Sequence, residues 1–321
     1  MSHLAITDRP GAQWFPKAGF GIFLHWGISS VDGYLDISWG MMKDYKWSPR
    51  SCPPGEYFAL AKKFNPGRYD PEKWIVAAKA AGARYCVLTT RHHDSYALWP
   101  SAYGDFNTRF YMDGRDLVGE YVKACRKHGM KVGFYYSPPD FRTCGEYMDY
   151  NGWQPNRYAE IPPVLEQYSA AIAKGQIYEL LTKYQPDLLW FDGGWQHLYK
   201  LDELLALQPD LVVGRGGGSH FESSECIIPT PEQYEQKFKG GWWEFCGELS
   251  NCWGYTRWDE YNIKPVAVLA DWFTSIRTMG GNYLINVAPD SEGDFTPLEY
   301  ERLAELGEFV KSHPELMPEW P

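Results

Sequence analysis

Short apolar segments alternate with longer segments of helical periodicity along most of the chain. This alternation is typical of parallel βα units, in which a helix returns across the sheet after each strand. Strands are predicted at residues 20–25, 84–90, 131–136, 187–192, 211–214, 226–228, 243–248 and 282–287. Helices are predicted at residues 71–81, 116–128, 164–184, 201–207, 266–279 and 297–311.

The predicted strands number eight, and most of them are followed by a predicted helix. A chain of 321 residues accommodates a (β/α)8 barrel, which needs about 250 residues, with room for long loops. A doubly wound sheet would alternate in the same way, but eight units in one domain favour a closed barrel. No linker or repeat divides the chain, so we expect a single α/β barrel domain over residues 1–321.

Polar or ionisable side chains stand at the ends of five predicted strands. They are His25, the pair His92 and His93, Tyr135, Asp192 and Arg215. The carboxyl ends of barrel strands meet at one rim, where catalysis occurs in this fold. We therefore expect these side chains to form one site.

Aromatic residues make up 17% of the chain, including 15 Trp and 23 Tyr, and many lie in polar or glycine-containing stretches. The apolar face of a sugar stacks on a flat ring whose N–H or O–H can also bond a hydroxyl, so a carbohydrate ligand is expected. The net charge of −10 argues against nucleic acid or an anionic membrane surface as a partner, because both need a basic surface.

The seven cysteines have no C-x-x-C spacing, and Cys86 and Cys125 lie in apolar surroundings, so buried free thiols are expected. Residues 1–10 are polar and lack the apolar core of a signal peptide. No run approaches the roughly 18 apolar residues of a transmembrane helix. A cytoplasmic location is expected, or a secreted or periplasmic one if a leader has been removed.

Asp192 is the strongest candidate for a catalytic residue. It follows the apolar run Leu188–Phe191 and precedes two glycines, which let a ligand approach the backbone. An Asp also caps helices, but the next predicted helix begins only near residue 201. Retaining hydrolysis of a glycoside needs a second carboxyl group about 5–5.5 Å away. The downstream candidates are Glu222, Glu225, Glu232, Glu244 and Glu248.

Neither a metal nor a cofactor is expected. Adjacent residues of an extended strand point to opposite sides, so His92 and His93 are not expected to hold one metal ion. No H-E-x-x-H or Cys/His cluster indicates zinc. The glycines at 214–218 lack the Gly-Lys-Ser/Thr of a phosphate loop, and those at 280–281 precede a strand rather than follow one. Neutral imidazoles that bond sugar hydroxyls are the preferred interpretation of the histidines.

The sequence resembles the glycoside hydrolase family 29 α-L-fucosidases in a series of motifs that run in order along nearly the whole chain. The matching segments are residues 14–15 (WF), 17–27 (KAGFGIFLHWG), 64–66 (FNP), 80–85 (AAGARY), 92–94 (HHD), 98–101 (LWPS), 133–137 (GFYYS), 186–193, 253–255 (WGY) and 280–289 (GGNYLINVAP). The resemblance implies a retaining exo-glycosidase that acts on terminal α-L-fucosides of oligosaccharides or glycoconjugates.

The resemblance also implies roles for single residues. Asp192 would be the nucleophile. Glu232, in Thr-Pro-Glu, resembles the usual acid/base segment and is the first choice, and Glu244, in Trp-Trp-Glu, is the second. Sugar binding is implied for His25, Trp39, His92, His93, Tyr135, Trp190 and Arg215.

Two departures from the family pattern bear on specificity. Members usually carry Glu-Trp in the first βα loop, where this chain has Ser38-Trp39, with Asp36 nearby. Losing that carboxylate should cost roughly 1.5–3 kcal/mol of sugar binding unless Asp36 replaces it. No C-terminal β-sandwich of the kind common in the family is expected after the barrel, so its sugar contacts would be missing or come from a neighbouring subunit of a homo-oligomer. An α-L-galactoside or modified sugar is therefore an alternative substrate; a non-catalytic sugar-binding barrel and a metal-dependent hydrolase are further alternatives.

Overall fold

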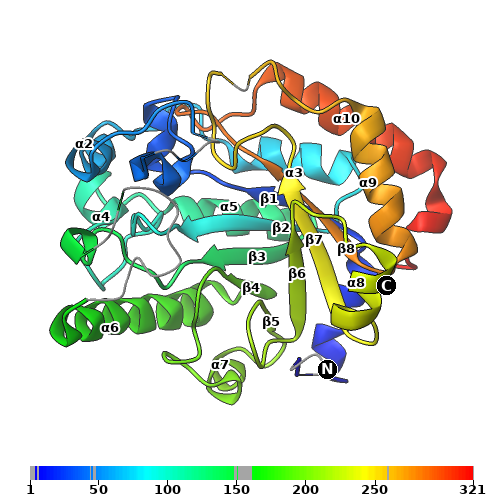
Figure 1. Ribbon diagram of the computed structural model, residues 1–321, viewed down its shortest axis with the longest axis horizontal. Helices are drawn as coiled ribbons and strands as arrows, with labels where there is room; N and C mark the ends of the chain where they lie inside the picture. Colours follow the sequence, from blue (N-terminus) through cyan, green and yellow to red (C-terminus); the bar gives the residue numbers. More distant parts are fainter. Residues whose placement is uncertain are drawn as a thin grey trace.

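The computed structural model describes residues 4–320 apart from Ile6, Asp44, Lys46, Trp47, residues 148–149 and 151–160, and Asp259. Within these residues the chain forms a closed barrel of eight parallel strands in sequence order (Figure 1). The strands are β1 (Phe20–Leu24), β2 (Tyr85–Arg91), β3 (Lys131–Tyr136), β4 (Leu188–Phe191), β5 (Val212–Gly214), β6 (Phe221–Glu225), β7 (Trp242–Glu248) and β8 (Asn282–Val287). The predicted (β/α)8 architecture is confirmed.

Helices surround the barrel, and polar side chains fix where several of them begin. Asp70, Asp116 and Thr296 each accept a hydrogen bond from a backbone N–H in the first turn of α3, α5 and α10. The helices are α1 (Phe15–Ala18), α2 (Pro54–Ala59), α3 (Pro71–Ala80), α4 (Thr108–Tyr111), α5 (Leu117–Lys127), α6 (Pro163–Glu179), α7 (Leu201–Leu207), α8 (Pro231–Lys237), α9 (Val266–Thr278) and α10 (Pro297–Ser312). Single turns are η1 (Pro10–Ala12), η2 (Ile28–Val31), η3 (Ile37–Met41), η4 (Leu60–Lys62), η5 (Gly145–Tyr147), η6 (Leu180–Tyr184) and η7 (Pro314–Leu316).

The barrel closes because β1 pairs with both β2 and β8, with Ile22 opposite Cys86 on one side and Ile285 on the other. Seven of the eight strands are buried over every residue or all but the ends, as expected when helices cover the outer face and side chains fill the interior. Cys86 and Cys125 are buried thiols, as predicted. Across the described residues, the helices are too short or too polar to cross a membrane.

The N-terminal segment fills one end of the barrel. Phe15 is fully buried and stacks on Phe221 of β6 with 4.3 Å between ring centroids. Trp14 and Tyr85 pack edge-on beside it. Because Tyr85 and Phe221 are the first residues of their strands, this aromatic group closes the amino-terminal end and leaves the functional rim at the other end.

The sixth unit differs from its prediction. A strand was expected at residues 226–228 with no helix after it, whereas β6 is Phe221–Glu225 and α8 follows at Pro231–Lys237. β6 reads Phe-Glu-Ser-Ser-Glu and α8 has no buried residue, so neither shows an apolar pattern. β5 leads directly into β6 through residues 215–220, and the predicted helix 164–184 divides into α6 and the π turn η6.

Candidate active site

A cavity of about 880 Å³ opens at the carboxyl ends of the strands. Its wall gathers residues from β1, the first long loop, β2, β3, β4 and the turn after β5. Seven of the residues predicted for the site line it: His25, Trp39, His92, Tyr135, Trp190, Asp192 and Arg215. His93, the eighth predicted residue, contacts the carboxylate of Asp192.

Asp192 directly follows β4 and is held by three side chains. Its Oδ2 accepts a hydrogen bond from the Tyr135 hydroxyl at 2.7 Å, and His93 Nε2 lies 3.3 Å from the same oxygen. Its Oδ1 accepts from Arg215 Nη1 at 3.0 Å. Gly193 follows with a φ of 108°, a conformation that suits glycine and turns the chain away from the carboxylate.

These contacts keep Asp192 ionised. Burial alone would raise the pKa of this carboxyl group, but the hydrogen bond from His93 and the charges of His93 and Arg215 outweigh burial. The pKa therefore lies well below its usual value. The group is an anion over the whole physiological pH range and remains open to the cavity, with 26% of its side chain exposed.

A second carboxylate stands beside Asp192, on Glu225 at the end of β6. The Nη1 atom of Arg215 lies 3.0 Å from Asp192 Oδ1 and 2.5 Å from Glu225 Oε1. Asp192 Oδ1 and Glu225 Oε1 are therefore separated by at most the sum of these two distances. This upper limit is compatible with the separation of about 5–5.5 Å between the carboxyl groups of retaining glycosidases.

Glu225 is held partly in its protonated form. Its side chain is 41% exposed to the cavity, yet the surrounding protein removes enough water to raise its pKa to about 7. The negative charges of Asp192 and Glu248 raise it further, while Arg215 opposes them. Two neighbouring carboxyl groups thus differ in charge near neutral pH, as acid and nucleophile must.

The two glutamates preferred from sequence lie elsewhere. Glu232 is exposed at the start of α8, where it accepts a hydrogen bond from Gln236. Glu244 is fully buried inside the barrel, and it accepts hydrogen bonds from the Tyr85 hydroxyl and from Trp190 Nε1. The sequence offers Glu225 only as one of five downstream candidates for the second carboxyl group. It lies in a polar segment whose pattern does not distinguish it from the other four glutamates.

Glu244 supports the floor of the cavity through Trp190. The Trp190 ring that it holds stacks beside Tyr135, at 5.5 Å between centroids. On Trp190 rests the guanidinium of Arg215, 4.5 Å from the ring centroid. Arg215 itself has a φ of 66°, so its backbone adopts the left-handed conformation while its side chain reaches both carboxylates.

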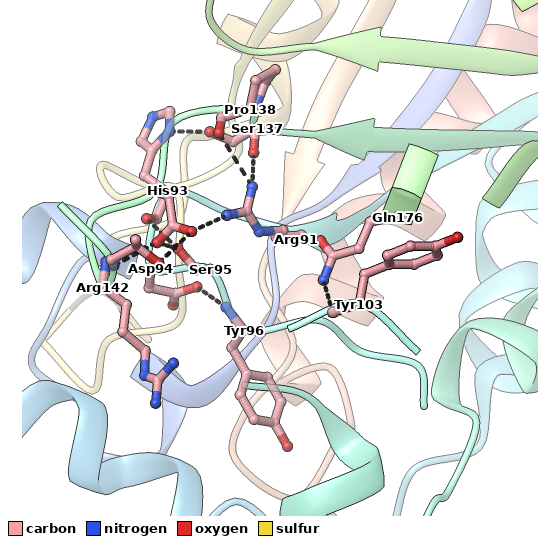
Figure 2. Close-up of polar contacts among 12 residues, drawn as sticks. Arg91, His93, Asp94, Ser95, Tyr96, Tyr103, Ser137, Pro138, Arg142 and Gln176 are labelled. Carbon is pink, nitrogen blue, oxygen red and sulfur yellow. Dashed lines mark hydrogen bonds and ion pairs between the residues drawn. The ribbon is translucent and has the colours of Figure 1, made fainter. Parts of the chain in front are cut away.

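A buried ion pair holds Ser137, which contacts the His93 imidazole (Figure 2). Arg91, fully buried at the end of β2, pairs with Asp140 at 3.1 Å and donates to the backbone oxygen of Ser137. The Ser137 hydroxyl in turn contacts His93 Nδ1. Because a carboxylate only accepts, His93 donates from Nε2 to Asp192, while its Nδ1 lies against the Ser137 hydroxyl. These contacts fix the orientation of the imidazole that faces Asp192.

His25 and His92 are neutral cavity residues. Burial lowers the pKa of His25 to about 4 and that of His92 well below its usual value. His25 Nδ1 lies 2.7 Å from Asn286 Oδ1, and the Asn286 amide nitrogen donates to the Trp253 oxygen. Nδ1 of His25 therefore carries the proton, and Nε2 is an acceptor for a ligand hydroxyl.

The side chains of Ser38 and Asp36 both form hydrogen bonds within the protein. The Ser38 hydroxyl lies 2.8 Å from His92 Nδ1, and its side chain is fully buried in η3. Asp36, also fully buried, accepts from the Gly254 N–H at 2.8 Å and so ties η3 to the loop after β7. Asp36 therefore does not replace the carboxylate that the family usually offers to the sugar at this loop.

His92 and His93 lie close enough to share a metal ion with Asp192, contrary to the expectation from the sequence. One ligand atom from each of the three residues lies within 4.8 Å of the others. The two histidines follow the end of β2, so strand alternation does not separate them. The donor set nevertheless fits a metal poorly. Arg215 and Tyr135 already donate to both oxygens of Asp192, and the guanidinium would repel a second cation at the same carboxylate.

Comparisons with known proteins agree with this geometry. A family model for α-L-fucosidases matches residues 3–315. Human tissue α-L-fucosidase is 28% identical over 336 residues, which cover 95% of this chain and 69% of its own. α-L-Fucosidase isoenzyme 1 from Paenibacillus thiaminolyticus superposes with a TM-score of 0.81 at 29% identity, over 96% of this chain and 77% of that one. Thermotoga maritima α-fucosidase, solved in complex with fucose, gives 0.78 at 30% identity, over 96% and 75%.

The family match extends over nearly the whole described chain, and the solved relatives share its barrel from β1 to β8. We conclude that the chain belongs to the α-L-fucosidases of glycoside hydrolase family 29.

Proposed function

We propose that this enzyme hydrolyses terminal α-L-fucosides with retention, using Asp192 as nucleophile and Glu225 as acid/base. The observation that supports the assignment is Arg215 Nη1, which contacts both carboxylates and so holds them close enough to act as a retaining pair. This replaces Glu232 and Glu244 as the preferred acid/base.

The first step breaks the bond between the anomeric carbon and the leaving oxygen. Asp192 attacks the carbon while protonated Glu225 gives its proton to that oxygen, which leaves a covalent glycosyl-enzyme. Esterification removes the negative charge of Asp192, one of the causes that raise the pKa of Glu225. The pKa of Glu225 therefore falls, so the carboxylate left after proton donation stays ionised and is available as the base. It takes a proton from water, the water oxygen attacks the anomeric carbon, and the bond to Asp192 breaks to release the sugar.

The remaining residues bind and orient the sugar. His25 Nε2 and the neutral imidazole of His92 are suited to sugar hydroxyls, while Trp39 and Trp190 offer apolar faces. His93 and Arg215 hold the nucleophile in its ionised form, and the Tyr135 hydroxyl donates a hydrogen bond to it. No metal takes part in this scheme, so kcat/KM should not change on treatment with a chelator.

Azide rescue tests both carboxylates at once. Asp192→Ala should lose at least about 10³-fold in kcat on an aryl fucoside, and azide should restore turnover with the inverted fucosyl azide as product. Glu225→Ala should keep partial activity on good leaving groups, and azide should give the retained azide. Glu232→Ala, on the exposed start of α8, is the matched control. Retained azide from Glu232→Ala or Glu244→Ala would overturn the choice of Glu225.

Ser38, which stands where the family usually has a glutamate, favours a second candidate function: hydrolysis of a broader range of sugars. Without a carboxylate at this loop, discrimination for fucose rests on fewer charged contacts, so an α-L-galactoside or a modified deoxy-sugar is the alternative substrate. A panel of aryl α-L-fucoside, α-L-galactoside and β-D-galactoside separates the two by kcat/KM. A non-catalytic sugar-binding barrel would bind fucose and release no aryl group from any of them.

A further inference from the structure

Ile37 has a backbone conformation that a branched side chain rarely adopts. Its φ is 42°, in the left-handed region, where a branched Cβ crowds the backbone. Such a conformation persists only where the surrounding structure holds it, and it is found most often at binding and catalytic sites. Ile37 lies in the wall of the cavity that contains Asp192, so this strained turn belongs to the sugar site.

Two hydrogen bonds hold Ile37 in place, one from each neighbour in the sequence. Asp36 accepts from the Gly254 N–H at 2.8 Å, and the Ser38 hydroxyl lies 2.8 Å from His92 Nδ1. Gly254 also lets Ile37 come close, because a Cβ at Gly254 would lie 2.7 Å from Ile37 Cγ2. The side chain of Ile37 is therefore held at the cavity wall by contacts from the loops after β2 and β7.

The wall around Ile37 presents an apolar surface to the sugar. The side chains of Asp36 and Ser38 are fully buried, whereas that of Ile37 reaches the cavity. The aromatic rings of Trp39 and Tyr45 continue this surface, with 5.9 Å between their centroids. The carboxylate and the hydroxyl on either side of Ile37 therefore do not reach a ligand.

A sugar hydroxyl that faces Ile37 would lose its water without gaining a partner from residues 36–38. An unpaired hydroxyl weakens binding, whereas a methyl ether in its place has no proton to donate and buries apolar area on Ile37. An acetyl ester brings a carbonyl oxygen, which again needs a donor. The wall therefore suits a methyl ether better than a hydroxyl or an ester.

We infer that Ile37 is a specificity-determining residue and that the sugar of the substrate is a fucose with one ring hydroxyl methylated. The methyl group of the ether packs on Ile37, and the hydroxyls farther from this wall are bound by His25 and His92. The inference rests on the proposed fucosidase activity and adds the modification of the sugar that the site selects.

A panel of aryl α-L-fucosides tests the methyl ether directly. The unmodified fucoside is compared with its 2-O-methyl, 3-O-methyl and 4-O-methyl ethers, because the wall selects one hydroxyl. The unaltered enzyme should cleave one of these ethers with a kcat/KM about tenfold above that of the unmodified fucoside. The other two should be poorer substrates, since their methyl groups meet the polar side of the site.

Ile37→Asn tests the residue. Asparagine tolerates a positive φ, so the backbone of η3 is kept while an amide replaces the apolar contact. The preference for the ether over the unmodified fucoside should fall by at least about tenfold, and Ile37→Leu should keep it within about threefold. A loss of structure alone would lower both rates together and leave their ratio unchanged. The matched control is Val164→Asn, at a branched side chain 70% exposed on α6 outside the cavity wall.

The outcomes separate this inference from the proposed function. Preference for the unmodified fucoside over all of its methyl ethers would overturn the inference and leave the fucosidase activity standing. An unchanged ratio in Ile37→Asn would overturn the role of Ile37, and a higher kcat/KM for an O-acetyl fucoside would overturn the ether. Failure to cleave any aryl fucoside, methylated or not, would overturn the proposed function together with this inference. Should Ile37→Asn not fold, the panel with the unaltered enzyme still decides.

Discussion

At the scale of single residues, a few short contacts and nearby charges determine the charge states of Asp192 and Glu225. Asp192 is kept ionised by His93 and Arg215, whereas burial and the charge of Asp192 keep Glu225 protonated up to about neutral pH. Arg215 touches both groups and lowers both pKa values, so the difference between them comes from the other neighbours. The charge states of these two carboxyl groups are thus set by their surroundings rather than by residue type.

The pH profile follows from this difference. The acid step needs protonated Glu225, whose pKa is about 7, so kcat/KM for a poor leaving group should fall as the pH rises through about 7. The acidic limb should lie well below pH 4, because the pKa of Asp192 is lowered. Measurement across pH 3–9 tests both limbs, with stability checked at each end. Glu225→Gln should lose the alkaline limb; an unchanged limb in that variant would assign it to another group.

Glu244 is predicted to position Trp190 rather than to transfer protons. Gln at 244 has one acceptor oxygen for two donors, Tyr85 and Trp190, so one donor loses its partner. Glu244→Gln should cost about 1–3 kcal/mol in the free energy of unfolding, measured in urea. Its activity on an aryl fucoside should fall, and azide should not restore it. Rescue by azide would contradict a positioning role.

At the scale of elements, helices contact one another closely where glycine allows it. Gly307 of α10 lies against α3, and a Cβ there would come within 2.8 Å of the Ala80 backbone oxygen and 2.9 Å of Ala81 Cα. Backbone atoms cannot rotate away as a side-chain tip can. The two helices are therefore held at a distance that only glycine permits.

Gly307→Ala tests this contact against helix propensity. Alanine would stabilise an isolated helix by about 1 kcal/mol relative to glycine, but the clash with α3 should outweigh the gain and destabilise the protein by about 1–3 kcal/mol. Urea unfolding measures the change, with the exposed Glu301→Ala in the same helix as control. A more stable variant would show that α10 moves freely away from α3.

At the scale of the whole molecule, the N-terminal segment completes the barrel far from the chemistry. Phe15 and its aromatic neighbours fill the end opposite the cavity. All eight strands meet around that interior, so loss of the packing is felt by the barrel as one cooperative unit.

Phe15→Ala should therefore lower global stability and spare catalysis. Removal of a fully buried phenyl ring costs about 3–5 kcal/mol, seen as a lower urea midpoint in a single transition. kcat/KM well below the unfolding range should stay near its original value. Phe110→Ala, which removes a ring 60% exposed, is the control and should change little. A separate early transition would mean that the segment unfolds alone.

The sequence by itself determined the barrel and most of its rim. Hydrophobic periodicity located seven strands nearly to the residue, because buried parallel strands are continuous apolar runs. Polar residues directly after such runs had to meet at one rim, which is why His25, Tyr135, Asp192 and Arg215 were found together. β6 and α8 were missed because their residues are mostly polar and little buried.

Only the tertiary structure decided which glutamate faces Asp192. The five candidate glutamates all lie between residues 222 and 248, and sequence separation does not measure distance in space. The barrel buries Glu244, leaves Glu232 on the surface of α8, and brings Glu225 to the guanidinium that also holds Asp192. The same is true of Ser38 and Asp36, whose partners come from β2 and from the loop after β7. Such contacts join segments far apart in the chain, and only the closure of the barrel brings those segments together.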